Sequence, residues 1–297
     1  MTDGGLTIGV SLKMYFGRRQ TLDWCLEVAA VARRHPALAG GRAELFVLPA
    51  APLIDPVLRI FDGADVGVGA QNLSDQDSGP LTGEVSGALL REMGCRYAEI
   101  GHAERRRLFG EDDAAAAAKV AASWRNRLTP VLCVGEAAPM PPAEAARACV
   151  AEAEAILGHA ETILGHAETI LGQPANVRGQ AGAVGPDPAA VARRVILAYE
   201  PHWAIGQPEP APTGHIAEVG GALRRWLASR PELAGSRVIY GGSAGLGLLD
   251  RLGGSVDGLF LGRFAHDPAA LAAILDEAGH PRQPEHPQQA QTQKAVR

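Results

Sequence analysis

Short apolar runs and longer amphipathic stretches alternate along the chain. Eight runs rich in Val, Ile and Leu predict β-strands, at residues 6–10, 44–48, 65–69, 97–100, 130–134, 195–199, 237–240 and 258–261. Most are followed by Gly, Pro or a polar turn and then by a helical pattern, as at residues 22–32, 114–124 and 216–227. This order is typical of parallel sheets, in which a helix connects each strand to the next.

Eight strand–helix units in 297 residues predict one α/β domain, a closed (β/α)8 barrel over residues 1–277. A doubly wound sheet is the alternative. It is disfavoured because the glycine-rich GxGxxG turn of dinucleotide-binding sheets is missing after the first strand, where Ser11, Leu12 and Lys13 stand instead.

One segment does not follow this alternation of strands and helices. The sequence Ile-Leu-Gly-His-Ala-Glu-Thr at residues 156–162 repeats at 163–169, and a third copy begins at Ile170. We expect a helical insertion around residues 151–188, lengthened by duplication, although each glycine costs a helix about 1 kcal/mol relative to alanine. The repeated His159 and His166 lack nearby carboxylates, so we interpret them as solvated surface residues rather than metal ligands.

Two other segments lack the pattern of a packed element. Residues 173–188 are rich in Gly, Pro and Ala and predict a loop that leads into the sixth strand. Residues 278–297 contain Pro, Gln and His with little to bury, so we expect a disordered C-terminal tail.

Composition narrows the classes of function. With 28 Lys+Arg against 33 Asp+Glu the chain is mildly acidic, which argues against nucleic-acid binding through phosphates. The four cysteines lack the spacing of a zinc site or a disulfide framework, so we expect no metal, no cofactor and a cytoplasmic location. The first apolar stretch, residues 6–12, is too short to cross a membrane.

Polar residues and glycines gather where the predicted strands end. In a (β/α)8 barrel such positions converge on one mouth, and the loops after strands seven and eight usually hold phosphate. Backbone N–H groups that no side chain covers, as at glycines, are suited to that anion. The residues are Ser11, Lys13, Pro49, Gln71, Asn72, His102, Glu104, Cys133, Glu136, Glu200, Gly241, Gly242, Ser243, Gly262 and Arg263.

Taken in order, these motifs resemble triosephosphate isomerases, although each alone is weak. The resemblance covers nearly everything from residue 6 to about 276 apart from the insertion. It implies the TIM (β/α)8 barrel as the fold and sugar-phosphate isomerisation as the activity. The motifs are GVSLKM at 9–14, GAQNL at 69–73, TGE at 82–84, GHAERR at 101–106, LCVGE at 132–136, AYEPHWAIG at 198–206, YGGS at 240–243 and DGLF at 257–260.

The resemblance also implies roles for three residues. Glu200 is the base that removes a proton from the carbon next to the substrate carbonyl, and His102 polarises that carbonyl and moves a proton between oxygens. Lys13, with Glu104 as its ionic partner, supplies positive charge beside the developing enediolate. We expect His102 to open a helix whose positive end favours the neutral imidazole. Without the surrounding motifs, Glu200 would be interpreted as a solvent-exposed residue at a strand end, and Lys13 as an ordinary surface lysine at the mouth of the barrel.

The same resemblance implies roles for further residues in the lid, the dimer contact and the phosphate site. Residues 201–206 are similar to a lid over the phosphate, and Glu136 is a supporting residue. The loop from Gln71 to Glu84 resembles a dimer loop, so we expect a homodimer in which Thr82 reaches the neighbouring pocket. The residues expected to bind substrate or phosphate are Ser11, Gly206, Gly242, Ser243, Gly262 and Arg263.

Four positions depart from the family pattern. Ser11 stands where asparagine is usual, and Ala103 replaces a serine, which removes a partner of Glu200 and a helix cap. The usual Gly-Thr-Gly-Lys end of the lid reads Gly-Gln-Pro-Glu at 206–209, where proline stiffens the hinge. Arg263 replaces the second glycine of the last phosphate loop and could clamp phosphate or fill space.

Three interpretations of function follow. The first is a triosephosphate isomerase that interconverts dihydroxyacetone phosphate and glyceraldehyde 3-phosphate in glycolysis and gluconeogenesis. The second is an isomerase of four-carbon ketose phosphates such as erythrulose phosphate, since a smaller residue at position 11 could admit an extra CH–OH unit. The third is a non-catalytic barrel that binds a phosphorylated metabolite, which needs none of the base chemistry that Lys13, His102 and Glu200 together provide.

Overall fold

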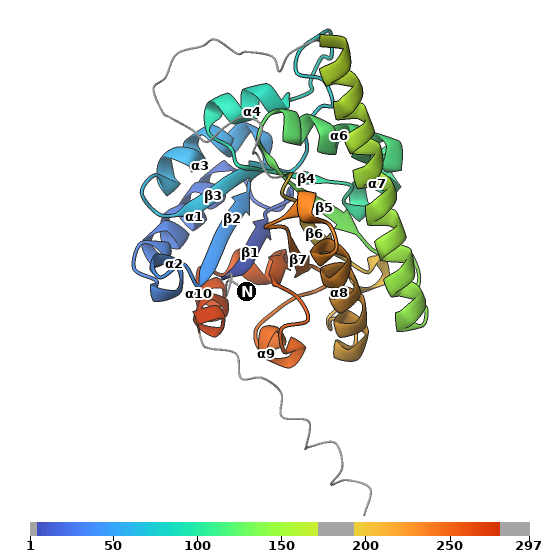
Figure 1. The fold of residues 1–297 in the computed structure, drawn as a ribbon. Helices are drawn as coiled ribbons and strands as arrows, with labels where there is room; N and C mark the ends of the chain where they lie inside the picture. The colour runs from blue at the N-terminus through green and yellow to red at the C-terminus, as the bar shows by residue number, and fades with distance from the viewer. Residues whose placement is uncertain (1–4, 172–192, 280–297) are drawn as a thin grey trace, which may run out of the picture.

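Eight parallel strands close into a barrel in the order β1 to β8 (Figure 1). The computed structural model describes residues 5–171 and 193–279. All eight predicted strands are present, each within one residue of its predicted ends. The strands are β1 (Leu6–Ser11), β2 (Ala43–Leu48), β3 (Val66–Ala70), β4 (Tyr97–Ile100), β5 (Thr129–Val134), β6 (Ile196–Tyr199), β7 (Arg237–Tyr240) and β8 (Gly258–Leu261).

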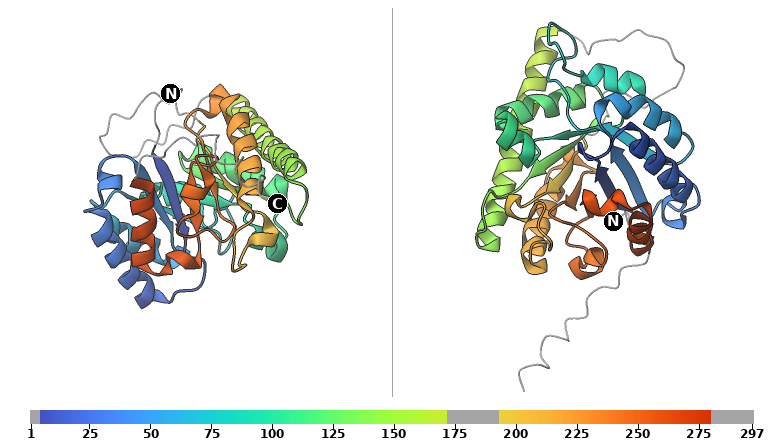
Figure 2. Two further views of the ribbon diagram at one scale, coloured as in Figure 1. Left: turned by 90° about the horizontal axis from the view of Figure 1, so that it is seen from below. Right: turned by 180° about the vertical axis from the view of Figure 1, so that it is seen from behind.

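Helices surround this barrel on all sides, as the views from below and behind show (Figure 2). The predicted TIM (β/α)8 architecture is therefore confirmed. The α-helices are α1 (Arg18–Ala32), α2 (Pro36–Ala39), α3 (Ile54–Phe61), α4 (Gly87–Met93), α5 (Ala103–Phe109), α6 (Asp113–Arg125), α7 (Pro142–Leu171), α8 (Thr213–Ala228), α9 (Leu248–Leu252) and α10 (Pro268–Gly279). Short 3₁₀ segments are η1 (Ala51–Leu53), η3 (His202–Ala204), η4 (Pro231–Leu233) and η5 (Arg263–His266).

Two layers of buried side chains hold the strands in place. Because side chains alternate along a strand, one set faces the helices and the other fills the barrel. The inner set is a compact cluster, and two residues further along the chain come Glu99 on β4, Glu200 after β6, and glycines after β5, β7 and β8. The cluster consists of Phe46, Leu48, Tyr97, Val131, Cys133, Ile196, Ala198, Ile239 and Phe260.

Local signals fix several helix ends. Ser86 accepts a hydrogen bond from the backbone N–H of Leu89 and caps α4, which ends at Gly94 with φ 106°. Asp112 caps α6 in the same way through the N–H of Ala115. Both caps lie in the segments that follow β3 and β4, at the same end of the barrel as the residues that follow the other strands.

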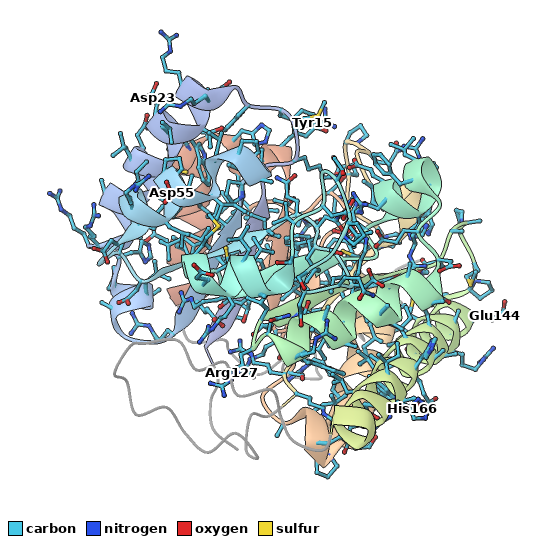
Figure 3. The ribbon with its side chains drawn as sticks, turned by 90° about the horizontal axis from the view of Figure 1, so that it is seen from above. Tyr15, Asp23, Asp55, Arg127, Glu144 and His166 are labelled. Atoms are coloured by element: carbon cyan, nitrogen blue, oxygen red, sulfur yellow. The ribbon has the colours of Figure 1, made fainter. Side chains whose placement is uncertain are left out.

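The repeated segment is helical through residue 171, as its pattern predicts. It belongs to α7, which begins earlier, at Pro142, and packs against α6 and α8 (Figure 1). Ile156, Leu157 and Leu164 are buried against the barrel, whereas His159 and His166 are exposed. Figure 3 shows His166 on α7 at the outer edge of the molecule. The predicted loop at 173–188 lies outside the described residues.

The C-terminal boundary of the barrel lies slightly beyond the predicted one. Helix α10 continues to Gly279, and Ala278 is buried, so the expectation of a tail from residue 278 is wrong for these first two positions. The remainder of the predicted tail lies outside the described residues. Within residues 5–171 and 193–279, no helix combines the length and apolarity that crossing a membrane requires.

Candidate active site

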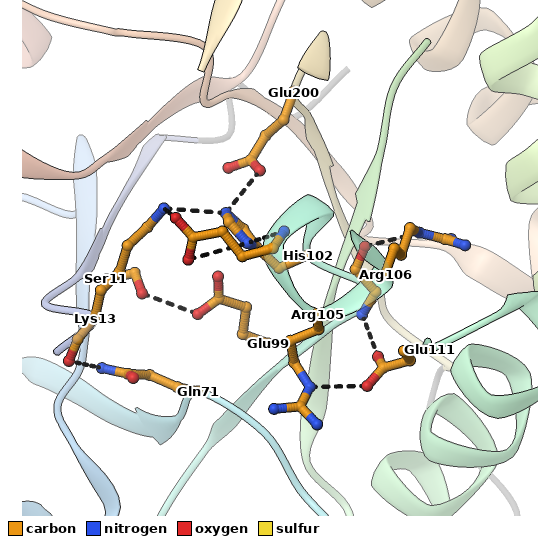
Figure 4. Close-up of polar contacts among 11 residues, drawn as sticks. Ser11, Lys13, Gln71, Glu99, His102, Arg105, Arg106, Glu111 and Glu200 are labelled. Atoms are coloured by element: carbon orange, nitrogen blue, oxygen red, sulfur yellow. Dashed lines mark hydrogen bonds and ion pairs between the residues drawn. The ribbon is translucent and has the colours of Figure 1, made fainter. Parts of the chain in front are cut away.

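The structure brings Lys13, His102 and Glu200 together at the mouth of the barrel (Figure 4). Nε2 of His102 lies 3.2 Å from Oε2 of Glu200 and 3.3 Å from Nζ of Lys13. Each residue lies one or two positions beyond the end of a different strand: Lys13 after β1, His102 after β4 and Glu200 after β6. Strand closure into a barrel therefore converts three distant sequence positions into one cluster.

His102 begins helix α5, and its own ring caps that helix. The backbone N–H of Glu104 donates to Nδ1 of His102 at 3.1 Å. The prediction that Ala103 deprives this helix of a side-chain cap is therefore wrong, because the imidazole of the preceding residue takes that role. An accepting Nδ1 carries no proton, so a neutral His102 carries its proton on Nε2, the atom that faces Glu200 and Lys13.

The environment keeps His102 neutral. Burial and the positive charge of Lys13 together lower the pKa of His102 to about 4, while Glu104 opposes the shift. Two hydrogen bonds hold its loop in place: the N–H of Gly101 donates to Glu111 and Nε of Arg106 donates to the carbonyl of Gly101. A fixed, neutral imidazole can donate a hydrogen bond to a substrate oxygen throughout the neutral pH range.

Lys13 is held with its ammonium in the cluster. Nζ donates to Oε1 of Glu104 at 2.9 Å, as predicted, and the carbonyl of Lys13 accepts from Nε2 of Gln71 at 3.0 Å. The backbone of Lys13 is in the left-handed region with φ 47°, a conformation that non-glycine residues rarely adopt and that is often found at functional sites. Burial lowers the pKa of Lys13, but Glu104 and Glu200 outweigh this effect and raise it, so the side chain stays charged.

Glu200 is a buried carboxylate with an oxygen left available. Oε2 has no hydrogen-bond partner among the described residues, although it lies close to His102. Two glycines make room for this residue. A Cβ at Gly241 would lie 2.4 Å from Oε1 of Glu200, and a Cβ at Gly135 would lie 2.1 Å from the backbone carbonyl of Glu200.

Burial also makes Glu200 a strong base. Burial, opposed by the charge of Lys13 and aided by the negative charges of Glu99 and Glu104, raises the pKa of Glu200 to about 8. A carboxylate is best suited to remove and return protons when its pKa lies near the working pH. Glu200 therefore has the position and the proton affinity of a general base.

A cleft of about 1050 Å³ opens from this cluster toward the loops after β6, β7 and β8. Most of the residues predicted to bind substrate or phosphate line it: Ser11, Gly206, Ser243, Gly262 and Arg263. Gly242 stands beside this group between Gly241 and Ser243, where its carbonyl accepts a hydrogen bond from the hydroxyl of Tyr240. Nη2 of Arg263 lies 3.5 Å from the carbonyl of Gly206, so this guanidinium bridges the last loop and the lid.

The Ser243 side chain holds the lid. Its hydroxyl lies 2.9 Å from the carbonyl of Ala204 and 2.8 Å from that of Gln207, and its backbone is left-handed with φ 56°. The hydroxyl is therefore engaged with the lid rather than with the cleft.

Glu136 holds the start of the lid through hydrogen bonds to residues at the end of β6 and in the lid itself. Its carboxylate accepts from Nε1 of Trp203 at 2.9 Å and from the hydroxyl of Tyr199, and Nε2 of His215 lies 2.8 Å away. Glu136 is therefore a structural support of the lid and does not line the cleft. His215 was not identified from the sequence, since a histidine on a helix gives no signal of a buried carboxylate partner.

Two further buried carboxylates escaped the sequence analysis. Glu111 accepts hydrogen bonds from the N–H of Gly101, Nε of Arg105 and Nζ of Lys119, which ties the His102 loop to α6. Glu99 lies inside the barrel on β4 and accepts from the hydroxyl of Ser11 at 2.9 Å. Strand alternation could have identified Glu99, because it shares the inward face of β4 with Tyr97.

The cluster is suited to moving protons on a small anionic carbonyl compound. A buried base, a neutral hydrogen-bond donor and a fixed ammonium lie close together, and the glycines and Arg263 of the later loops line the same cleft. The described part of the chain holds no group of three or more His, Cys, Asp or Glu side chains arranged to bind a metal ion.

Comparisons with known proteins agree with this chemistry. Residues 6–278 match the triosephosphate isomerase family. An L-erythrulose-1-phosphate isomerase from Pectobacterium atrosepticum is 51% identical over 94% of this chain and 97% of its own length. A triosephosphate isomerase from Moorella thermoacetica is 35% identical over 81% of this chain and 88% of its own length.

A solved structure matches the whole barrel. The crystal structure of triosephosphate isomerase from Bartonella henselae superimposes with a TM-score of 0.68 and 26% identity, covering 91% of this chain and 98% of that one. The chain therefore belongs to the triosephosphate isomerase family and is an isomerase of sugar phosphates.

Proposed function

We propose that this protein isomerises a four-carbon ketose phosphate, L-erythrulose 1-phosphate. The observation that carries the proposal is the 51% identity with the Pectobacterium protein of that name, over nearly the full length of both chains. Two triosephosphate isomerases, from Moorella thermoacetica and Symbiobacterium thermophilum, are 35% and 36% identical over about four fifths of this chain.

Each step of this reaction can be assigned to a residue that lines the cleft. Glu200 removes the proton from C3, beside the C2 carbonyl, and the electron pair of that C–H bond forms the C2–C3 double bond of an enediolate. Lys13 and the Nε2–H of His102 stabilise the charge that develops on oxygen. Glu200 returns the proton to C2, while a proton moves between the two oxygens through His102. The carbonyl ends on C3, and no atom is gained or lost.

The phosphate would bind where the cleft meets the loops after β6, β7 and β8. Gly262 has open space around its Cα, and a helix begins directly after it, so backbone N–H groups can approach an anion there. Arg263 adds a guanidinium at the same end. A lid that shields this end protects the enediolate from water and from loss of phosphate.

Triosephosphate isomerisation is the second candidate, because Lys13, His102 and Glu200 would serve dihydroxyacetone phosphate by the same steps. Steady-state kinetics with both substrates separate the two. The proposal predicts that kcat/KM for L-erythrulose 1-phosphate exceeds that for dihydroxyacetone phosphate by at least about tenfold, the effect of one favourable contact on a transition state. The reverse order would favour the triose reaction. A protein that binds these compounds but neither converts them nor exchanges their C–H protons with solvent would be a binding barrel.

We also propose that the protein acts as a homodimer in the cytoplasm. The loop from Gln71 to Glu84 carries the exposed side chain of Leu81, and Met14 and Tyr15 beside the active site are exposed as well. Exposed apolar side chains on two loops suit a contact between copies of the chain. Analytical ultracentrifugation tests this: Leu81→Asp should yield monomers at concentrations where the parent is dimeric.

The cytoplasmic location is supported by the four cysteines. They are free and buried, which suits a reducing compartment.

A further inference from the structure

Glu99 is a buried carboxylate that the proton-transfer steps do not use. It is 3% exposed, and its side chain faces the barrel interior from β4. Within the described residues, the hydroxyl of Ser11 supplies its hydrogen bond, at 2.9 Å to Oε2. The nearby ammonium of Lys13 is hydrogen-bonded to Glu104 instead. Burying a carboxyl group with so little compensation is unfavourable for folding, which points to a role in binding or reaction.

The hydrogen bond between these two residues has a definite direction. Burial raises the pKa of Glu99 to about 7, so above that pH its ionised carboxylate can only accept, and the single hydroxyl proton of Ser11 is committed to it. The remaining lone pairs of Ser11 Oγ can then only accept a hydrogen bond. Ser11 lines the cleft, whereas Glu99 lies beneath it (Figure 4). The floor of the cleft at this point therefore presents an acceptor to the substrate.

The position of this acceptor relative to the phosphate end is set by the barrel. The phosphate loops follow β6, β7 and β8. Ser11 ends β1, which pairs with β8, but its hydroxyl points across the barrel to Glu99 on β4 and so away from those loops. Lys13, His102 and Glu200 line the same cleft as Ser11. A substrate held by its phosphate and reacting at Glu200 therefore extends its unphosphorylated end toward Ser11.

We propose that the Ser11–Glu99 pair selects the four-carbon substrate by accepting, through Ser11 Oγ, a hydrogen bond from the terminal C4 hydroxyl. Glu99 is a positioning residue that fixes the direction of the Ser11 hydroxyl. A three-carbon substrate ends one carbon earlier and leaves this acceptor without a partner. An asparagine at position 11 would reverse the polarity, because its amide nitrogen donates. This inference rests on the proposed function and names the residues that give it its specificity.

The test compares two enzymes and three substrates. The substrates are L-erythrulose 1-phosphate, the same ketose phosphate with a methyl group in place of the terminal CH2OH, and dihydroxyacetone phosphate. The parent enzyme should lose about ten- to a hundredfold in kcat/KM on the methyl analogue, as expected for one lost hydrogen bond at a buried site. Ser11→Ala should convert L-erythrulose 1-phosphate and its methyl analogue with nearly equal kcat/KM.

Variants of Glu99 separate positioning from packing. Glu99→Leu removes the acceptor of the Ser11 proton, so the ratio of kcat/KM for the four-carbon to the three-carbon substrate should fall about tenfold. Glu99→Gln keeps an acceptor oxygen and should retain most of that ratio. Thr7→Val changes another buried polar residue of β1, far from the cleft, and serves as the matched control that keeps the parent ratio. Circular dichroism confirms that each variant is folded.

Three outcomes overturn the inference. The first is a parent enzyme that converts the methyl analogue as well as L-erythrulose 1-phosphate. The second is that the Glu99 variants lose activity on the four-carbon and the three-carbon substrate by the same factor. That result would indicate a structural role for Glu99 and would not affect the proposed function. The third is a parent enzyme that converts only dihydroxyacetone phosphate, which contradicts the proposed function itself.

Discussion

Oε1 of Glu200 occupies the space in which a side chain on Gly241 would begin. A Cβ on Gly241 would lie 2.4 Å from that oxygen and 2.7 Å from Cγ of the same side chain. Gly241 follows β7 and Glu200 follows β6, and these two strands are paired in the barrel. The glycine in this loop thus determines where the carboxylate lies, in addition to leaving the backbone open to an anion.

Replacing Gly241 by alanine should therefore displace the base. The added methyl group forces the Glu200 carboxylate away from its position by about 1 Å, a displacement that typically costs on the order of a hundredfold in rate. We expect kcat to fall by about that factor while KM changes much less. Gly214→Ala, on helix α8 where an added Cβ meets nothing within 4 Å, is the matched control and should keep the parent kcat. Equal kinetics for the parent and Gly241→Ala would contradict this role.

Position 11 should control the choice of substrate. Ser11→Asn adds volume and an amide donor where β1 ends at the cleft. We expect the ratio of kcat/KM for the four-carbon to the three-carbon substrate to fall by about tenfold or more, because the larger side chain excludes the terminal CH2OH. The measurement is steady-state kinetics with both substrates. An unchanged ratio would mean that another part of the cleft selects the substrate.

The charge of Glu99 should influence the pH at which the base becomes active. Burial raises the pKa of Glu200, Lys13 lowers it, and the carboxylates of Glu99 and Glu104 raise it, to about 8 in total. Glu99→Gln removes one of these negative charges, so ionisation of Glu200 becomes easier. The rise of kcat/KM with pH should then occur at lower pH than in the parent protein. Both proteins are measured with the same substrate, so that the ionisation of its phosphate affects both pH profiles equally. Identical pH profiles of kcat/KM for the parent and Glu99→Gln would contradict this coupling between Glu99 and Glu200.

The same substitution should stabilise the protein at high pH. Burial raises the pKa of Glu99 from 4.5 to about 7, so the folded protein retains a proton that the unfolded chain releases. Stability is therefore lost as the pH rises from about 4.5 to 7, by at most about 3 kcal/mol in total. We expect Glu99→Gln to raise the melting temperature above pH 7 and to change it little at pH 4.5. An increase of the same size at both pH values would indicate a cause other than ionisation.

Much of the fold could be predicted from the sequence because its signals are local. Each strand is an apolar run followed by a turn, and the barrel rule then assembles the strand ends at one mouth. Lys13, His102 and Glu200 were found in this way, since each lies within three residues of the end of a predicted strand. Their proximity in the structure agrees with the sequence-based hypothesis, while their roles remain proposals.

The parts that sequence reasoning missed depend on contacts between distant elements. The capping of α5 by His102 needed the orientation of the imidazole ring, which no motif encodes. The Ser11–Glu99 hydrogen bond crosses the inside of the barrel between β1 and β4, which are not neighbours in the sheet. The same holds for His215, whose partner Glu136 lies across the lid loop.

The repeated segment offers a stability prediction independent of the active site. Gly158 lies within α7, and an added Cβ there would meet nothing within 4 Å. Gly158→Ala should raise the free energy of unfolding by about 0.5–1 kcal/mol, because alanine has the higher helix propensity. Chemical denaturation measures this change, and kcat/KM should stay at the parent value. Destabilisation would mean that the glycine has a packing role that this structure does not show.

The most direct test of the account is solvent proton exchange with Glu200→Gln. In deuterium oxide, the parent protein should place deuterium on the carbon next to the carbonyl of L-erythrulose 1-phosphate, as followed by NMR of the substrate and product. Glu200→Gln has no basic oxygen and should reduce that exchange by at least about a thousandfold. Exchange at the parent rate in a folded Glu200→Gln protein would contradict the assignment of Glu200 as the base, and with it the central claim.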